Sequence, residues 1–275
     1  MEHPAELRFV TYLSPGIPRA FYKAVVDHVR HALGRPASLS VESRVSGPMR
    51  GTDDPFSCEE ADVGFMCAPS FFWLRELKDP PVELLPAAPV FRDDRMPGQP
   101  AYFSEVIVHR ENPVRSFPEL RGCSWAYNDV CSLSGYYNLL KKLAEMNEDG
   151  GFFGRICCSK SHLNSIEMVA RGEVDAAAID SNVLRIKHRS APDLRERLRI
   201  IESWGPFPIQ PVVLRSSLHP ELKDRLRAAL LTIGVDPYAA TTFDGFGLER
   251  FASVTYEHYA SEERALRECE RALGV

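Results

Sequence analysis

Short apolar runs and amphipathic segments alternate along most of the chain. The strand-like runs are continuously apolar or alternate with period two, and they occupy residues 7–13, 38–44, 61–67, 82–91, 99–110, 123–127, 155–159, 174–180 and 198–204. The helix-like segments repeat apolar positions every three or four residues, and they occupy residues 18–33, 69–77, 116–122, 134–146, 162–172, 220–234 and 256–273. Strands that alternate with helices in this way predict an α/β fold.

The order of these elements predicts two lobes. The long strand 99–110 leaves one α/β unit and enters another, and the proline-rich stretch GPFPIQPVV (205–213) provides a stiff return. We therefore predict lobe 1 from residues 1–103 and 208–275, and an inserted lobe 2 from residues 104–207. Ligands usually bind between two such lobes, so we expect a ligand cleft there.

Composition narrows the function classes. The 275 residues are 44% hydrophobic and 26% charged, and the net charge of −5 with dispersed Lys and Arg argues against nucleic-acid binding. No apolar run approaches the roughly 20 residues that span a bilayer, so no membrane insertion is expected. The N-terminus lacks the pattern of a signal peptide, and seven cysteines, an odd number, favour free thiols in a reducing compartment. We expect a cytoplasmic protein with no metal and no cofactor.

The turn CSLSGYYN (131–138) between a strand and a helix is the strongest candidate for ligand contacts. A helix N-terminus exposes unpaired N–H donors and a partial positive charge, which suit an anion. Ser132 and Ser134 add neutral hydroxyl donors, and Gly135 permits close backbone approach. The alternative interpretation is that one of the serines is an ordinary N-cap.

Three further positions carry candidate chemistry. His162 begins another helix after two serines and could donate to an anion, although a surface or capping role is the alternative. Asp180 ends a buried strand, where α/β sites gather, whereas Asp175 at the other end of that run is interpreted as structural. Cys131 precedes the turn, where a helix terminus could lower the pKa of a thiol, and a weak nucleophilic alternative pairs Cys131 with His162.

Several segments taken in order resemble one known family. The segments FVTYL, ADVGFMCAPSFFWL, PAYFSEVIVHR, SLSGYYN, SKSH, VARGEVDAAAIDS and GPFPIQPVV are similar, in sequence order, to the phosphate/phosphonate-type solute-binding proteins of bacterial ABC transporters. The resemblance covers roughly residues 8–215. It implies the two-lobed α/β architecture of type 2 periplasmic binding proteins, each lobe a mixed sheet flanked by helices, hinged by the crossing strands.

The resemblance also implies which positions contact the ligand. Its hydroxyl and backbone donors come from the SLSG turn, its histidine from SKSH, and its polar contacts from the strand end at Asp180 to Asn182. The full set of expected ligand-binding residues is Tyr12, Phe71, Tyr127, Ser132, Leu133, Ser134, Gly135, Tyr136, His162, Asp180 and Asn182. Phe71 departs from the tyrosine that the family commonly shows, and the absence of a signal peptide departs from a transport role.

Two functions of different classes follow. The first is a binding protein that traps a small oxyanion-bearing ligand, such as phosphate, a phosphonate or a phosphorylated metabolite, by hinge closure. The alternative is a cytosolic enzyme on the same scaffold that acts on a small acidic metabolite; fold alone does not decide between them. A small anionic ligand is the expected partner, and no transporter subunit can be specified.

Overall fold

Two five-stranded sheets carry the fold in the computed structural model, which describes residues 6–12 and 17–273. The described residues divide into two compact units. Unit 1 comprises residues 6–12, 17–101 and 208–263, and unit 2 comprises residues 102–207 and 264–273. The predicted division into two hinged lobes stays a prediction, and each unit is described by itself.

The unit 1 sheet has the strand order β2-β1-β3-β11-β4. Its strands are β1 (Leu7–Tyr12), β2 (Ala37–Glu42), β3 (Val63–Phe65), β4 (Val82–Leu84) and β11 (Val212–Arg215). Strand β1 runs parallel to β2 and β3, whereas β11 runs antiparallel to β3 and β4. A separate antiparallel pair joins β5 (Ala88–Phe91) to β12 (Leu248–Ala252).

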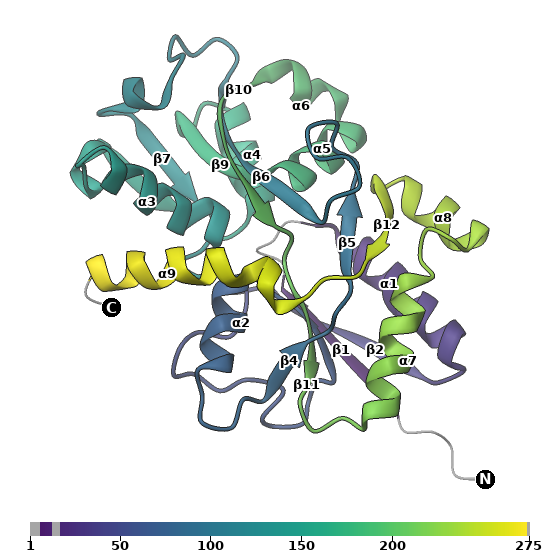
Figure 1. Ribbon diagram of the computed structural model, residues 1–275. Coiled ribbons are helices and arrows are strands. Elements are labelled where there is room, and N and C mark those ends of the chain that lie inside the picture. Colours follow the sequence, from purple (N-terminus) through teal and green to yellow (C-terminus); the bar gives the residue numbers. More distant parts are fainter. Residues whose placement is uncertain (1–5, 13–16, 274–275) are drawn as a thin grey trace. The chain divides into compact units, whose positions relative to one another are not determined.

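Helices pack on the unit 1 sheet through apolar faces. They are α1 (Arg19–Leu33), α2 (Ala68–Arg75), α7 (Pro220–Leu231) and α8 (Pro237–Asp244), and α1 lies beside α7 (Figure 1). Helix α1 buries Phe21, Tyr22, Val25, Val26 and Val29, the face that its period predicts. It ends at Gly34, whose φ of 60° is the left-handed conformation that glycine adopts without strain.

The unit 2 sheet has the strand order β10-β6-β9-β7-β8. Its strands are β6 (Ala101–His109), β7 (Ser124–Tyr127), β8 (Arg155–Cys158), β9 (Ala176–Asp180) and β10 (Leu198–Pro208). The three strands β9, β7 and β8 are parallel neighbours, and β6 runs antiparallel to β9. Consequently the carboxyl ends of β7, β8 and β9 lie at one edge of the sheet.

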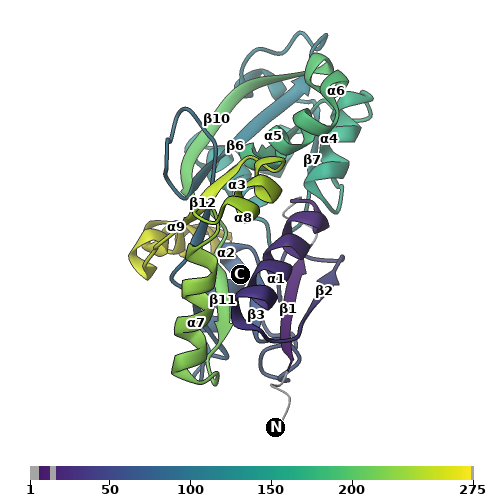
Figure 2. The same ribbon diagram turned by 90° about the vertical axis from the view of Figure 1, so that its right-hand side faces the viewer.

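Helices follow each of these three parallel strands. They are α3 (Asn138–Glu145) after β7, α4 (His162–Ala170) after β8, and α5 (Ser181–Ser190) with α6 (Pro192–Arg197) after β9, and α4 and α5 lie side by side (Figure 2). The final helix is α9 (Ala260–Leu273). A buried aromatic cluster that includes Phe117, Trp125, Phe152 and Phe153 packs with Leu139 and Leu143 of α3.

Most of the predicted elements are confirmed, with three corrections. The single strand predicted over 82–91 is wrong: β4 and β5 belong to different sheets, because Pro86 has no N–H to continue a ladder. The helix predicted from residue 134 begins as a π-helical turn at Leu133–Tyr137 and becomes α-helical at Asn138. The α-helices and strands without a predicted counterpart are α5, α6, α8, β11 and β12.

Candidate functional site

The polar candidates of unit 2 collect at the carboxyl ends of the three parallel strands. The turn at 131–137 follows β7, His162 starts the helix after β8, and Asp180 is the last residue of β9. Because β7 lies between β8 and β9 in the sheet, segments up to 50 residues apart in sequence meet around the central turn. This edge is where open α/β sheets bind ligands. We call the group formed by Ser132, Ser134, Gly135, His162, Asp180 and Asn182 the seat.

The turn itself leaves backbone donors open. Ser132 Oγ accepts from the N–H of Gly135 (3.2 Å), so Ser132 is an N-cap, as the alternative interpretation held. The N–H of Tyr137 donates to the Ser132 carbonyl (3.1 Å), which closes a π-type turn. Within the described residues, the N–H groups of Leu133 and Ser134 have no acceptor. Capping and open donors therefore coexist in this turn.

Gly135 is required by a close approach from Asn128. A Cβ at position 135 would lie 1.9 Å from Asn128 Oδ1 and 3.4 Å from His162 Cε1. Asn128 and His162 are each 1% exposed. Only glycine lets the amide and the imidazole lie against the turn.

A chain of polar side chains links all three strand ends. His162 Nε2 lies 3.2 Å from Ser134 Oγ and 3.3 Å from Asp180 Oδ1, and all three residues are buried. The Ser134 carbonyl in turn accepts from Ser104 Oγ on β6 (2.9 Å). His162 Nδ1 has no hydrogen-bond partner in the described part of the chain. The serine is thus positioned by the histidine and the neighbouring strand.

This geometry differs from that of a catalytic triad. In a triad the carboxylate contacts Nδ1 of the histidine and the nucleophile contacts Nε2. Here both Ser134 and Asp180 lie at Nε2 of His162.

Asn182 offers a second unused donor. Its Oδ1 accepts from the N–H of Val183 (3.0 Å), and its Nδ2 has no partner among the described residues although the residue is only 3% exposed. A buried amide donor without an acceptor is costly unless a ligand or water supplies one. This placement fits the expected role of the strand end.

Aromatic residues flank the turn. The rings of Tyr127 and Tyr136 are 5.1 Å apart, and both residues are half-buried. Burial, with smaller contributions from Cys158 and other neighbours, raises the pKa of Tyr127, so its hydroxyl remains a neutral donor. The side chain of Leu133 is buried, which limits this residue to its backbone N–H.

The two unit 1 candidates have different surroundings. Tyr12 lines a cavity of about 800 Å³ together with Glu42, Arg44 and Asp54, and burial reinforced by Asp54 and Glu42 raises the pKa of its hydroxyl. Phe71 is 0% exposed, packed against aromatic rings such as Tyr259 at 6.3 Å. Phe71 therefore packs in an aromatic cluster of unit 1, and its predicted ligand contact stays a prediction.

The surroundings of Cys131 do not support the weak alternative of an activated thiol. Burial, with a smaller contribution from Asp129, raises the pKa of the Cys131 thiol to about 12. The side chain is 0% exposed. Burial here outweighs any effect of the helix terminus, and the thiol stays protonated at neutral pH.

Three polar residues of this region have structural contacts around the seat or its sheet, and the sequence indicated only one of them. Asp175 accepts from the N–H (2.7 Å) and Oγ (2.6 Å) of Ser124, so its predicted structural role is confirmed. Asn128 and Ser104 contact the seat but were not predicted. Asn128 directly follows β7, so the strand-end rule could have found it. Ser104 lies inside a long strand, where nothing local marks it.

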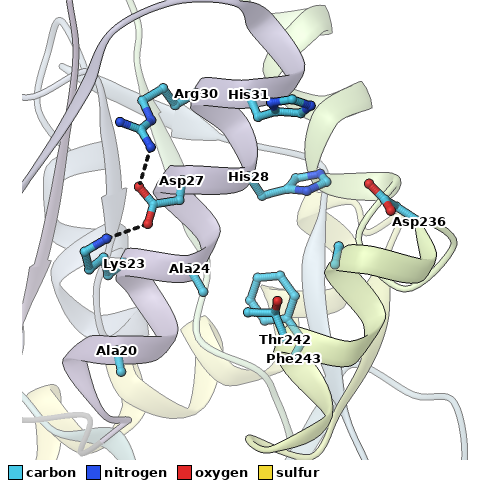
Figure 3. A pocket seen from close by; sticks show the side chains of 11 residues that line it. Ala20, Lys23, Ala24, Asp27, His28, Arg30, His31, Asp236, Thr242 and Phe243 are labelled. Carbon is cyan, nitrogen blue, oxygen red and sulfur yellow. Dashed lines mark hydrogen bonds and ion pairs between the residues drawn. The ribbon is translucent and has the colours of Figure 1, made fainter.

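Another cavity, of about 890 Å³, lies in unit 1 and is lined by residues of a different kind (Figure 3). Its rim cations are already paired, since Asp27 contacts both Lys23 (2.5 Å) and Arg30 (3.3 Å). His28 Nε2 is 2.9 Å from the Ala229 carbonyl. No cluster of three or more potential metal ligands occurs in the described residues, and no helix there is long and apolar enough to cross a membrane.

A match to a protein-family model identifies the family of the chain. The model for the periplasmic substrate-binding protein of ABC phosphonate transporters matches residues 8–259. The chain belongs to this family. The family resemblance predicted from the ordered motifs is thereby confirmed.

Individual relatives are distant. A phosphonates-binding periplasmic protein from Escherichia coli K12 is 25% identical over 163 residues, which are 56% of this chain and 47% of that protein. The match thus spans about half the length of this curated relative.

Solved structures confirm the fold at low identity. A binding protein component of an ABC phosphonate transporter from Pseudomonas aeruginosa has a TM-score of 0.81 at 16% identity, covering 98% of this chain and 88% of that one. PhnD1 from Prochlorococcus marinus, in complex with methylphosphonate, has a TM-score of 0.80 at 15% identity, covering 99% of each chain. An ancestral arginine-binding protein bound to arginine has a TM-score of 0.59 at 15% identity, covering 89% of this chain and 99% of that one. The fold of this family member is that of type 2 periplasmic binding proteins.

Proposed function

We propose that this phosphonate-family protein binds a small ligand through a phosphonate- or phosphate-type oxyanion at the seat. The open N–H groups of Leu133 and Ser134, beside buried hydroxyl and imidazole groups, carry this proposal. Oriented N–H donors at a helix start favour an anion, and neutral donors hold it reversibly. The family match and the methylphosphonate complex of PhnD1 support the same ligand class.

Besides the donors proposed for the oxyanion, the seat offers the ligand one carboxylate acceptor and one amide donor. Asp180 supplies a buried carboxylate and Asn182 an amide N–H without a partner in the described chain. A carboxylate repels an oxyanion and attracts a hydrogen-bond donor or an ammonium group. We infer that the ligand carries, besides its oxyanion, a polar group with a hydrogen-bond donor directed at Asp180.

Calorimetric titration tests the seat directly. Methylphosphonate and inorganic phosphate are titrated into the full chain, into Ser134→Ala and into the control Ser190→Ala, whose hydroxyl is exposed and contacts only the Lys187 carbonyl (3.0 Å). Hydrogen bonds to charged groups contribute about 1.5–3 kcal/mol, so Ser134→Ala should weaken binding about tenfold or more. Absence of binding at millimolar concentration, or equal effects of the two variants, would refute the proposal.

The location of the protein in the cell and its transport partner are proposed separately from its ligand. The prediction of a cytoplasmic protein stays a prediction, and the family description and the curated relative, both called periplasmic, argue against it. We infer that this chain delivers its ligand to an ABC transporter, since the family is defined by such systems. Cell fractionation with an antibody against the chain would decide the location.

A further inference from the structure

Three arginines gather at one end of unit 2. Arg110 follows β6, Arg115 lies in the loop after it, and Arg199 is the second residue of β10. Arg199 is half-buried, while Arg110 and Arg115 are exposed. None of them belongs to the seat, and Arg115 and Arg199 lie outside the segments that resemble the family.

This end of the sheet is opposite to the seat. In the antiparallel pairing of β6 with β9, Ser104 lies opposite Asp180, which marks the carboxyl end of β9. The chain then runs from Ser104 past the amino end of β9 at Ala176 to Arg110. At about 3.3 Å per strand residue, Arg110 is roughly 20 Å from the seat. A ligand held at the seat cannot be the anion that these arginines contact.

Backbone carbonyls hold two of the guanidinium groups together. Arg115 Nη1 donates to the carbonyl of Asn112 (2.9 Å), and Arg199 Nη2 donates to the same carbonyl (2.8 Å) and to that of Val114 (2.7 Å). Arg110 Nη2 donates to the carbonyl of Leu198 (3.4 Å), next to Arg199. Arg115 and Arg199 still have guanidinium N–H groups without an acceptor in the described part of the chain.

The loop that carries Arg115 and the acceptor carbonyls of Asn112 and Val114 is anchored to the sheet. Asn112 Nδ2 donates to Asp175 Oδ1 (3.3 Å), and Asn112 Oδ1 accepts from the N–H of Val114 (3.0 Å). Asp175 is itself fixed by Ser124. The cations are therefore positioned before any ligand arrives, which lowers the entropic cost of binding.

Positive charge at this end exceeds the negative charge beside it. Burial, followed by repulsion from Arg115 and Arg110, lowers the pKa of Arg199, and Glu119 is the carboxylate that acts in the opposite direction. Glu119 accepts from the N–H of Arg115 (3.0 Å) and from Ser116 Oγ (2.7 Å). Arg199 thus has two other guanidinium groups in its surroundings, and the carboxylate of Glu119 that opposes them is already engaged by local donors.

We propose that Arg110, Arg115 and Arg199 form a second anion site, which takes a dianionic phosphate group. The planar guanidinium fork matches the oxygens of a phosphate, and several guanidinium groups close together favour a dianion over a monoanion. The shared chemistry is a phosphate monoester or pyrophosphate group, supplied either by a free small molecule or by a phosphorylated side chain of a partner.

Pyrophosphate titration of the full chain at low ionic strength tests this site. Arg115→Gln and Arg199→Gln are measured singly and together, with Arg197→Gln as the control, because Arg197 is an exposed arginine of the same region whose side chain pairs with Asp193 (4.0 Å). Each cluster variant should weaken binding about tenfold, since one charge-assisted hydrogen bond is lost. The control should bind like the native chain. Arg115 is exposed, so its variant folds even if Arg199→Gln does not.

Pyrophosphate binding at the arginines should be independent of ligand binding at the seat. In a Ser134→Ala background the pyrophosphate site should persist, whereas methylphosphonate binding at the seat should weaken. A phosphoserine tripeptide and its unphosphorylated form then distinguish the two sources: binding of pyrophosphate alone indicates a free ligand, and binding of the phosphorylated tripeptide as well indicates a modified partner. Equal pyrophosphate affinity of native chain, Arg115→Gln and Arg197→Gln would overturn the proposal.

Discussion

Replacing Gly135 by alanine should damage the seat through one steric contact. The added methyl would lie 1.9 Å from Asn128 Oδ1 and 3.0 Å from Asn128 Cγ, far inside van der Waals contact. Asn128 and His162 are each 1% exposed, so neither can relieve the contact by turning out into solvent without rearranging its surroundings. Overpacking of this kind costs about 1–3 kcal/mol, partly offset by up to about 1 kcal/mol from the higher helix propensity of alanine. We expect the free energy of unfolding to fall by about 1–2 kcal/mol.

Urea denaturation followed by tryptophan fluorescence measures this cost, because Trp125 and Trp204 both lie in unit 2. Gly150→Ala is the matched control, since a Cβ there meets nothing within 4 Å and its backbone needs no positive φ. Adding Asn128→Ala removes the amide that clashes, so the cost of Gly135→Ala should largely disappear in that background. An equal cost of Gly135→Ala with and without Asn128, or a cost no larger than that of Gly150→Ala, would show that the reasoning is wrong.

Two further predictions concern buried ionisable groups. Burial opposes the ionisation of Asp62, but hydrogen bonds from Arg8 and Arg215 prevail and lower its pKa below the ordinary 3.8. The ionised carboxylate therefore stabilises the fold fully above that pH, and this stabilisation is lost as pH falls through the lower folded value, so Asp62→Asn should flatten the loss of stability in urea unfolding below about pH 4. An unchanged pH dependence of stability below about pH 4 would contradict this. The thiol of Cys131, whose pKa is raised to about 12, should resist iodoacetamide at pH 8 while the exposed Cys158 reacts, as peptide mass spectrometry would show; equal labelling of both would refute the burial argument.

Local patterns predicted most elements because their signals are local. Helix α1 has a five-residue apolar face and a glycine stop, and β9 is a continuous apolar run. Strand β5 could not be separated from β4 by hydrophobicity, since both are apolar and only Pro86 marks the break. Helix α5 was missed because it starts directly after β9 at Ser181, with no turn residues to announce it.

How well the sequence predicted the surroundings of a candidate residue depended on how much tertiary packing determines them. The SLSG turn could be found because its chemistry is contiguous in sequence. Phe71 could not be placed: an apolar aromatic in a short helix has the same local pattern whether it lines a site or fills a core, and here it is 0% exposed. Cys131 misled for a related reason, because the favourable helix terminus is visible in the sequence while the burial that raises its pKa is not.

The polar chain of the seat shows why sequence alone could not join its members. Ser134, His162 and Asp180 are separated by 28 and 18 residues, and each is an ordinary residue of a strand-to-helix connection. They meet because the strand order β9-β7-β8 places the turn after β7 between the other two connections. Were β8 on the other side of β9, His162 would still begin its helix but could not contact Ser134. The strand order of unit 2 therefore brings three separate strand-to-helix connections into one site, and the seat depends on that topology as much as on its side chains.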